Sequence, residues 1–162
     1  MVLVIISLLI FVIYLMFSLR YIGYVPASLS ETFYLIGKAK HCFTAMMFSI
    51  AVTLLPAMLN STPESRQFLA FLALSAICFV GAAPNFRDEF EGKVHKASAV
   101  IAATCGLLWV VFATDAWPMI ILSAFCVLVA AFRTNTARTS RVFWLEMIAF
   151  GSVYLSAIIQ AL

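Results

Sequence analysis

The chain has 162 residues, of which 65% are apolar and only 10% are charged, with a formal net charge of +3. Soluble domains are about 45–50% apolar and about 25% charged, so this composition excludes an ordinary soluble enzyme, a nucleic-acid-binding domain and a secreted disulfide scaffold. It also excludes a disordered chain, which requires low hydrophobicity, and the mean hydropathy of +1.09 predicts a protein surrounded mostly by lipid.

Six apolar stretches follow one another along the chain, separated by polar or helix-breaking residues. A bilayer core of about 30 Å is crossed by roughly 17–25 residues of helix. The stretches cover residues 2–19, 41–59, 67–83, 97–113, 118–132 and 142–162. One long helix through the fourth and fifth stretches is the alternative, but Asp115 and Pro118 favour a turn there. We predict an all-α, polytopic integral membrane protein, a single domain of residues 1–162 with six transmembrane helices in one bundle.

The connection after the first stretch has structure of its own. Ser28-Leu29-Ser30-Glu31 has the pattern of a capping box, which starts a helix. Residues 29–36 are therefore expected to be helical, either as a short separate helix ending at Gly37 or as the first two turns of one long second helix.

The basic residues are distributed unevenly among the connections. Nine of the ten lie in the first, third and fifth connections, and Arg66 alone lies on the other side. The nine are Arg20, Lys38, Lys40, Arg87, Lys93, Lys96, Arg133, Arg138 and Arg141. Cytoplasmic loops carry an excess of Lys and Arg. We therefore expect a multi-pass protein of a cell or inner membrane, with loops 1, 3 and 5 cytoplasmic and both termini on the opposite side.

Glu146 is the most prominent candidate for a functional residue, because it lies about one turn into the last apolar stretch. Ionisable groups at membrane depth are costly and usually functional. Arg141 is five positions earlier, too far for a pair at three- or four-residue spacing, so its partner is expected on another helix. Glu146 could accept a proton, coordinate a cation or orient a ligand. Alternatively, it is an interfacial carboxylate that reaches headgroup water or pairs with a loop Lys or Arg.

Two histidines and a carboxylate extend the candidate catalytic set. His41 and His95 begin the second and fourth apolar stretches, and Asp88 lies in the third connection. Together with Glu146 they could form an acid–base site or supply ligands for zinc. Their spacing is not diagnostic of a metal site, so a metal or another cofactor stays open. The alternative is that each histidine is an interfacial polar residue bonded to a backbone carbonyl.

Small and aromatic residues suggest how the helices pack. Ser98, Ala102 and Gly106 are four apart and permit close helix–helix approach. We expect this stripe to pack within the bundle rather than against a second copy. Trp109 and Trp117 near one face of the membrane, and Trp144 and Phe143 near the other, are predicted interfacial anchors.

Short motifs give the chain a resemblance to known families. They are Pro26-Ala27-Ser28-Leu29-Ser30-Glu31 after the first stretch, and Pro84, Asp88, Gly92 and His95 in and after the third connection. With its six predicted spans, the chain resembles small six-helix membrane families, namely the FGF-receptor-activating-protein/DRAM type and a bacterial family of unknown function. More distantly it is similar to ceramidase-like membrane hydrolases. Those carry a zinc site of several histidines and an aspartate, whereas this chain has only two histidines.

Three functions are compatible with these features. The first is an integral membrane protein, in contact with the lipid bilayer, that binds a lipid, a small hydrophobic ligand or a membrane partner. The second is a membrane-embedded, lipid-acting hydrolase with a cytoplasm-facing site of histidine and carboxylate. The third is an oligomeric channel or transporter, in which hydroxyl residues would have to converge at mid-depth. No nucleic-acid partner is expected, and homo-oligomerisation stays open.

Overall fold

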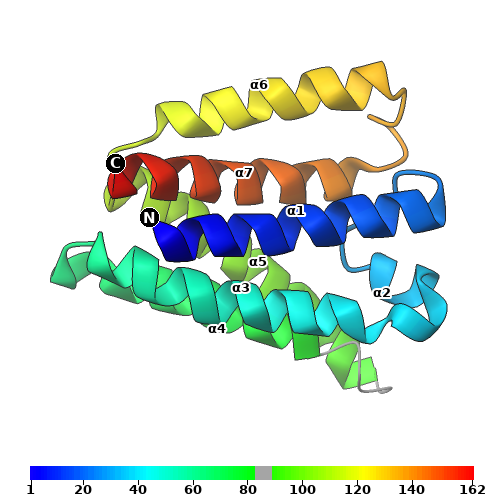
Figure 1. Cartoon of the computed structure of the whole chain (residues 1–162), viewed down its shortest axis with the longest axis horizontal. Coiled ribbons are helices and arrows are strands. Elements are labelled where there is room, and N and C mark those ends of the chain that lie inside the picture. The colour runs from blue at the N-terminus through cyan, green and yellow to red at the C-terminus, as the bar shows by residue number, and fades with distance from the viewer. Residues whose placement is uncertain (83–88) are drawn as a thin grey trace.

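The computed structural model describes residues 1–82 and 89–162, and side chains for residues 1–82 and 92–162. In this part of the chain all regular structure is helical (Figure 1). The elements are α1 (Val2–Ile22), α2 (Thr32–Leu35), η1 (Gly37–Ala39), α3 (His41–Asn60), η2 (Glu64–Arg66), α4 (Gln67–Ala82), α5 (Glu89–Phe112), α6 (Pro118–Arg133) and α7 (Arg141–Ala161). The all-α prediction is therefore confirmed for the described residues.

Each predicted apolar stretch corresponds to one long helix. Five helical segments are long and apolar enough to cross a membrane, namely Val2–Ile22, Gly37–Asn60 (η1 with α3), Glu64–Ala82 (η2 with α4), Gly92–Phe112 in α5 and Arg141–Ala161. The sixth, α6, has 16 residues. At about 1.5 Å per residue it is several ångströms shorter than a bilayer core of about 30 Å.

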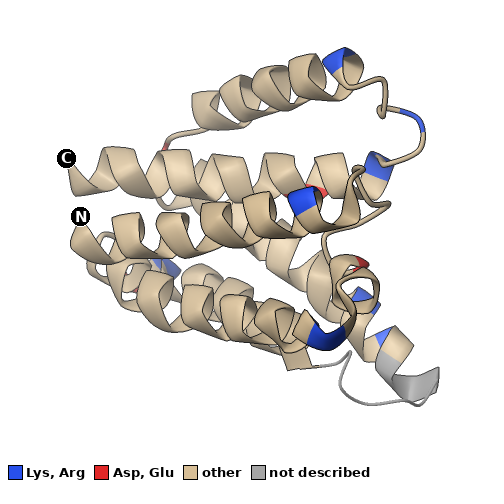
Figure 2. Ribbon diagram, turned by 45° about the vertical axis from the view of Figure 1, so that its right-hand side comes forward, with Lys and Arg blue, Asp and Glu red and all other residues tan. Residues whose placement is uncertain are grey.

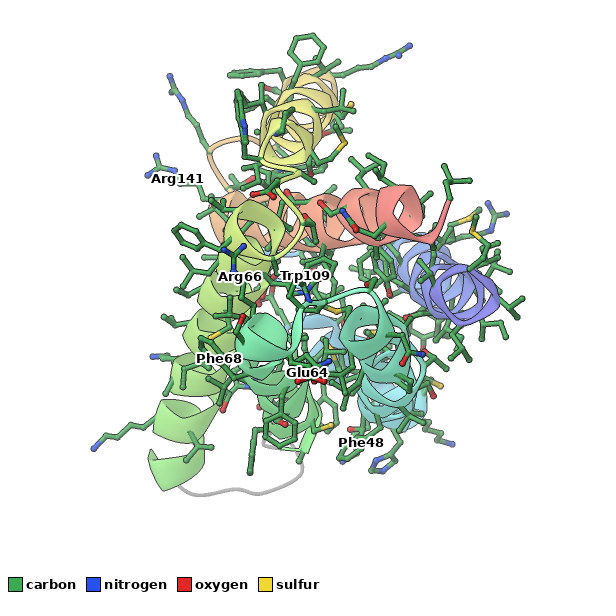
Figure 3. All side chains as sticks on the ribbon, turned by 90° about the vertical axis from the view of Figure 1, so that its left-hand side faces the viewer. Phe48, Glu64, Arg66, Phe68, Trp109 and Arg141 are labelled. Carbon is green, nitrogen blue, oxygen red and sulfur yellow. The ribbon has the colours of Figure 1, made fainter. Side chains whose placement is uncertain are left out.

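The long helices alternate in direction, so that both termini lie at the same end of the bundle (Figure 1). Five of them form a closed ring, because α1 contacts α3, α3 contacts α4, α4 contacts α5, α5 contacts α7, and α7 contacts α1. Helix α6 lies outside this ring and packs mainly on α7 (Figure 3).

Close packing between helices depends on small residues. A Cβ atom added at Gly81 would lie 2.6 Å from Met47 Cβ, and one at Gly151 would lie 2.5 Å from Ser123 Oγ. These contacts join α4 to α3 and α7 to α6. The predicted small-residue stripe also faces the interior, since a Cβ at Gly106 would lie 3.2 Å from Val153 Cγ2 on α7. Packing of this stripe within the bundle is confirmed.

The connection between α1 and α3 folds over one end of the ring. Leu29, Phe33 and Ile36 are buried there. Gly37 has a φ of +57°, a left-handed conformation that favours glycine, and it separates α2 from α3. The short separate helix is thus the correct alternative, and the long second helix is wrong.

The predicted capping box is only partly formed. The Glu31 N–H donates to Ser28 Oγ at 3.2 Å, as a capping box requires. The Glu31 carboxylate accepts the N–H of Ala27 at 2.6 Å rather than that of Ser28.

Trp109 corrects another prediction, because it is a core residue and not an interfacial anchor. Its side chain is 0% exposed and lies among the helices of the ring (Figure 3). The indole Nε1 donates to Thr62 Oγ1 at 2.7 Å, and the Thr62 hydroxyl donates to the Met58 carbonyl. The indole N–H has a protein partner, so this tryptophan does not need the membrane–water interface. Phe143 is likewise a core residue and not an anchor, since it is 1% exposed, whereas Trp117 is 57% exposed.

Charged side chains are concentrated at one end of the bundle. Most of the described Lys and Arg residues lie where α1 meets α2 and where α6 meets α7, and around the start of α5 (Figure 2). Arg66, in η2, lies at the opposite end, near the two termini.

Candidate functional site: an apolar pocket with one carboxylate

A pocket lies inside the ring, between α3, α4, α5 and α7. Its walls are mostly aliphatic and alanine side chains, among them Met47, Leu54, Ile77, Ala103 and Phe150. The empty space is about 720 Å³, including the part that opens to the outside. Pockets for small molecules are mostly apolar, with a few placed polar groups. The lining therefore suits a small hydrophobic ligand.

Glu146 is the only charged residue among the described residues that line this pocket. Helical spacing places it there, because Glu146, Ala149, Phe150 and Val153 form one stripe on α7 at intervals of three and four residues. Ser30 is a second polar lining residue, and its hydroxyl lies 3.1 Å from that of Ser28. The polar groups are thus at the end of the pocket that the α1–α2 connection covers.

The partner of Glu146 is a backbone group. Its Oε2 atom accepts the N–H of Leu29 at 2.6 Å, and Leu29 is 1% exposed. The expectation of a partner on another helix is therefore wrong, since Leu29 belongs to the connection before α2. The alternative, an ion pair between Glu146 and a loop Lys or Arg, is not found within the described chain either.

Two further bonds hold the same connection against α7. Ser140 Oγ donates to the Val25 carbonyl at 3.0 Å, and the Phe143 N–H donates to the Ala27 carbonyl at 2.9 Å. The first N–H groups of a helix have no partner within the helix, so the connection satisfies one of them. Together with Glu146, these bonds fix residues 25–29 along the start of α7.

The other carboxylate oxygen of Glu146 is available. In the described part of the chain Oε1 has no hydrogen bond and Glu146 has no ion pair. Glu146 is part-buried, and taking a charge out of water is unfavourable unless it is paired and hydrogen-bonded. The pocket thus contains an acceptor that is held in place on one side and is free on the other.

His95 is half-buried on α5, next to α4. It forms a hydrogen bond with the backbone of Val80, a residue that lines the pocket. Its Nδ1 atom is buried and has no partner in the described structure. The backbone bond agrees with the alternative in which this histidine is an interfacial polar residue bonded to a backbone carbonyl.

The remaining candidates do not join Glu146. His41 is exposed at the start of α3, and its ring stands edge-on to Phe33 at 6.3 Å. Asp88 lies outside the described residues. Among the described residues no contact links His41, His95 and Glu146, and no group of three or more His, Cys, Asp or Glu could hold a metal ion.

Comparisons with family models, curated proteins and solved structures found no match to this chain. The family resemblances drawn from short motifs therefore stay predictions, and the pocket is interpreted from its geometry.

Sequence reasoning identified Glu146 but missed the pocket around it. Four helices contribute its walls, so no single stretch of sequence contains it. One signal was present: Ala99, Ala102, Ala103 and Gly106 all line it on α5, and such small side chains leave space if the facing residues do not fill it.

Proposed function

We propose that this protein crosses a membrane with six helices and binds a small hydrophobic or lipid-derived ligand in the pocket inside the ring. The observation that carries the proposal is the combination of an apolar cavity with one fixed carboxylate at its end. Such a cavity offers burial to an apolar body and orientation to a single polar group.

The outer surface of the bundle supports the membrane location. Phe48 and Phe68 point away from the ring (Figure 3), and large apolar residues are exposed on every long helix, among them Ile13, Val52, Phe71, Val100, Phe125 and Leu145. In water, so much exposed apolar surface would cause association. In lipid it is the expected surface of a transmembrane bundle.

Helix α6 is included as the sixth span although it is short. Its exposed face carries Leu122, Phe125 and Val129, and lipid can thin locally around a short helix at modest cost. With six spans, both termini lie on one side and the basic end of the bundle is cytoplasmic by the usual distribution of Lys and Arg.

The channel and hydrolase alternatives have less support. A channel requires a polar path, but Thr53, Ser123 and Ser152 donate to helix carbonyls, and none of them lines the pocket. A hydrolase requires His41 and His95 to approach the carboxylates, and among the described residues they do not. Ligand binding is therefore the function we favour.

Photolabelling of the full chain in lipid nanodiscs tests ligand binding. The probe is dodecanol with a diazirine near the end of its chain. We expect saturable labelling of Ile77 or Phe150, which both line the pocket. An excess of dodecanol without the diazirine should remove this labelling. Labelling of Phe125, which is exposed on α6, should not saturate because it reports the surrounding lipid.

A matched pair of variants locates the binding site. Ala103→Phe fills the pocket, whereas Val100→Phe adds a ring on the outer face of the same helix, where Val100 is 65% exposed. Saturable labelling should disappear in the first variant and persist in the second. If labelling never saturates, or if both variants behave alike, the proposed function is wrong.

A further inference from the structure

We infer that the pocket binds a single-chain amphiphile whose head group is a protonated amine, with the Glu146 carboxylate as the group that binds the amine. This inference rests on the proposed function, because it specifies the ligand class of the same pocket.

The charge in the pocket is the first reason. Glu146 is the only charged residue among the described lining residues, and it has no ion pair within the described chain. Its carboxylate is part-buried, so less water screens its attraction to a cation than at an exposed position. An ammonium head would provide the missing cation, whereas a carboxylate head would be repelled.

The second reason is the arrangement of acceptors. Because the Leu29 N–H occupies Oε2 at 2.6 Å, the carboxylate is held in one orientation with Oε1 free. Ser30 lines the pocket next to Leu29 and provides a hydroxyl oxygen. An alkylammonium has three N–H donors, so one head group could donate to both residues while its chain runs between the aliphatic walls.

The basic end of the bundle does not contradict this charge assignment. Lys38, Lys40, Lys96 and Arg141 are exposed, and none of the described basic residues lines the pocket. They act on the membrane surface, where water and salt screen them. The carboxylate acts inside the bundle, where screening is much weaker.

The arrangement of the pocket lining favours a single chain. Its polar groups are at one end, beneath the α1–α2 connection, and the aliphatic side chains of α3 and α4 extend away from them. One polar head and one apolar chain match this division.

Equilibrium dialysis of the full chain in nanodiscs, against empty nanodiscs, tests the inference with three probes. Dodecylamine, dodecanol and dodecanoate share one chain and differ in the head group; the amine is protonated at neutral pH because alkylamines titrate at about 10. We expect dodecylamine to bind about tenfold or more tightly than dodecanol, and dodecanoate to bind more weakly than dodecanol.

Glu146→Gln then assigns the preference to the carboxylate. The variant removes the charge but keeps an oxygen that can accept the Leu29 N–H. The preference for the amine over dodecanol should disappear in this variant. Glu31→Gln is the matched control, because Glu31 accepts a backbone N–H of the same connection but does not line the pocket, and it should keep the preference.

The outcomes separate the two proposals. Equal affinity of the wild type for the amine and the alcohol, or an amine preference that survives in Glu146→Gln, would overturn the amine inference and leave the ligand pocket standing. Failure of all three probes to bind would overturn the pocket itself. The wild-type comparison decides the inference even if Glu146→Gln does not fold.

Discussion

The Glu146 carboxylate accepts a hydrogen bond from the backbone N–H of Leu29, a residue 117 positions earlier in the chain. This bond joins the last helix to the connection that closes one end of the ring. It also orients the only charged side chain among the described residues that line the pocket. The same carboxylate therefore holds the connection before α2 against α7 and provides the charged group of the pocket.

Removing this acceptor is expected to destabilise the fold. In Glu146→Ala the buried Leu29 N–H loses its partner, which costs about 1–3 kcal/mol, and Glu146→Gln should cost less because an acceptor oxygen remains. Unfolding in detergent by a chemical denaturant measures the difference. Glu64→Ala, at an exposed position, should have the stability of the wild type. Equal stability of Glu146→Ala and Glu146→Gln would show that the bond contributes little.

The contact between α6 and α7 can be tested by a double-mutant cycle. In Gly151→Ala the new Cβ would lie 2.5 Å from Ser123 Oγ but 3.5 Å from Ser123 Cβ. The single variant should lose about 1–3 kcal/mol of stability, the range for overpacking. In a Ser123→Ala background the same change should cost much less, because only the ordinary contact remains.

The control for this cycle is Gly92→Ala on α5. A Cβ at Gly92 has no neighbour within 4 Å, and alanine is the better helix former, so stability should not fall. If Gly151→Ala costs the same in both backgrounds, the close approach of α6 to α7 is not what the variant disturbs.

Trp109 and Trp117 lie at the end of the bundle that holds both chain termini, and replacing them should have different effects on stability. Trp109→Ala removes a fully buried ring and the bond to Thr62, and is expected to cost about 3–5 kcal/mol. Trp117→Ala alters an exposed side chain and should change stability by only about 0.5 kcal/mol. Thermal unfolding in one detergent compares them, and similar losses would contradict the core position of Trp109.

Reporter fusions in a bacterial inner membrane test the proposed sidedness. Alkaline phosphatase is active only outside the cytoplasm, so we expect activity when it follows Leu162 and none when it follows Arg138, in the basic α6–α7 connection. The reverse pattern would invert the proposed topology. Activity at both positions would mean that α7 does not cross the membrane.

The positions of the long helices could be predicted because apolar stretches are a local property. Their ends were less predictable, as α5 begins at Glu89 although the apolar stretch begins at residue 97. The helix continues through Lys93 and Lys96, which are good helix formers and are exposed. Hydropathy reports the apolar part of a helix and not its full length.

Features that depend on partners were harder to predict. A carboxylate in an apolar stretch is conspicuous, so Glu146 was identified, but a backbone N–H such as that of Leu29 has no sequence signature. Tryptophan is common both at membrane interfaces and in protein cores, so its position in the sequence does not tell which of these Trp109 occupies. Its hydrogen bond to Thr62, which depends on the folded structure, shows that it lies in the core. The pocket required the positions of four helices together.

The most direct test of a ligand pocket in this ring is native mass spectrometry of the full chain with added dodecanol, comparing the wild type, Ala103→Phe and Val100→Phe. We predict a one-to-one adduct for the wild type and for Val100→Phe, and its loss in Ala103→Phe. The same adducts in all three proteins, or none in any, would contradict binding inside the ring.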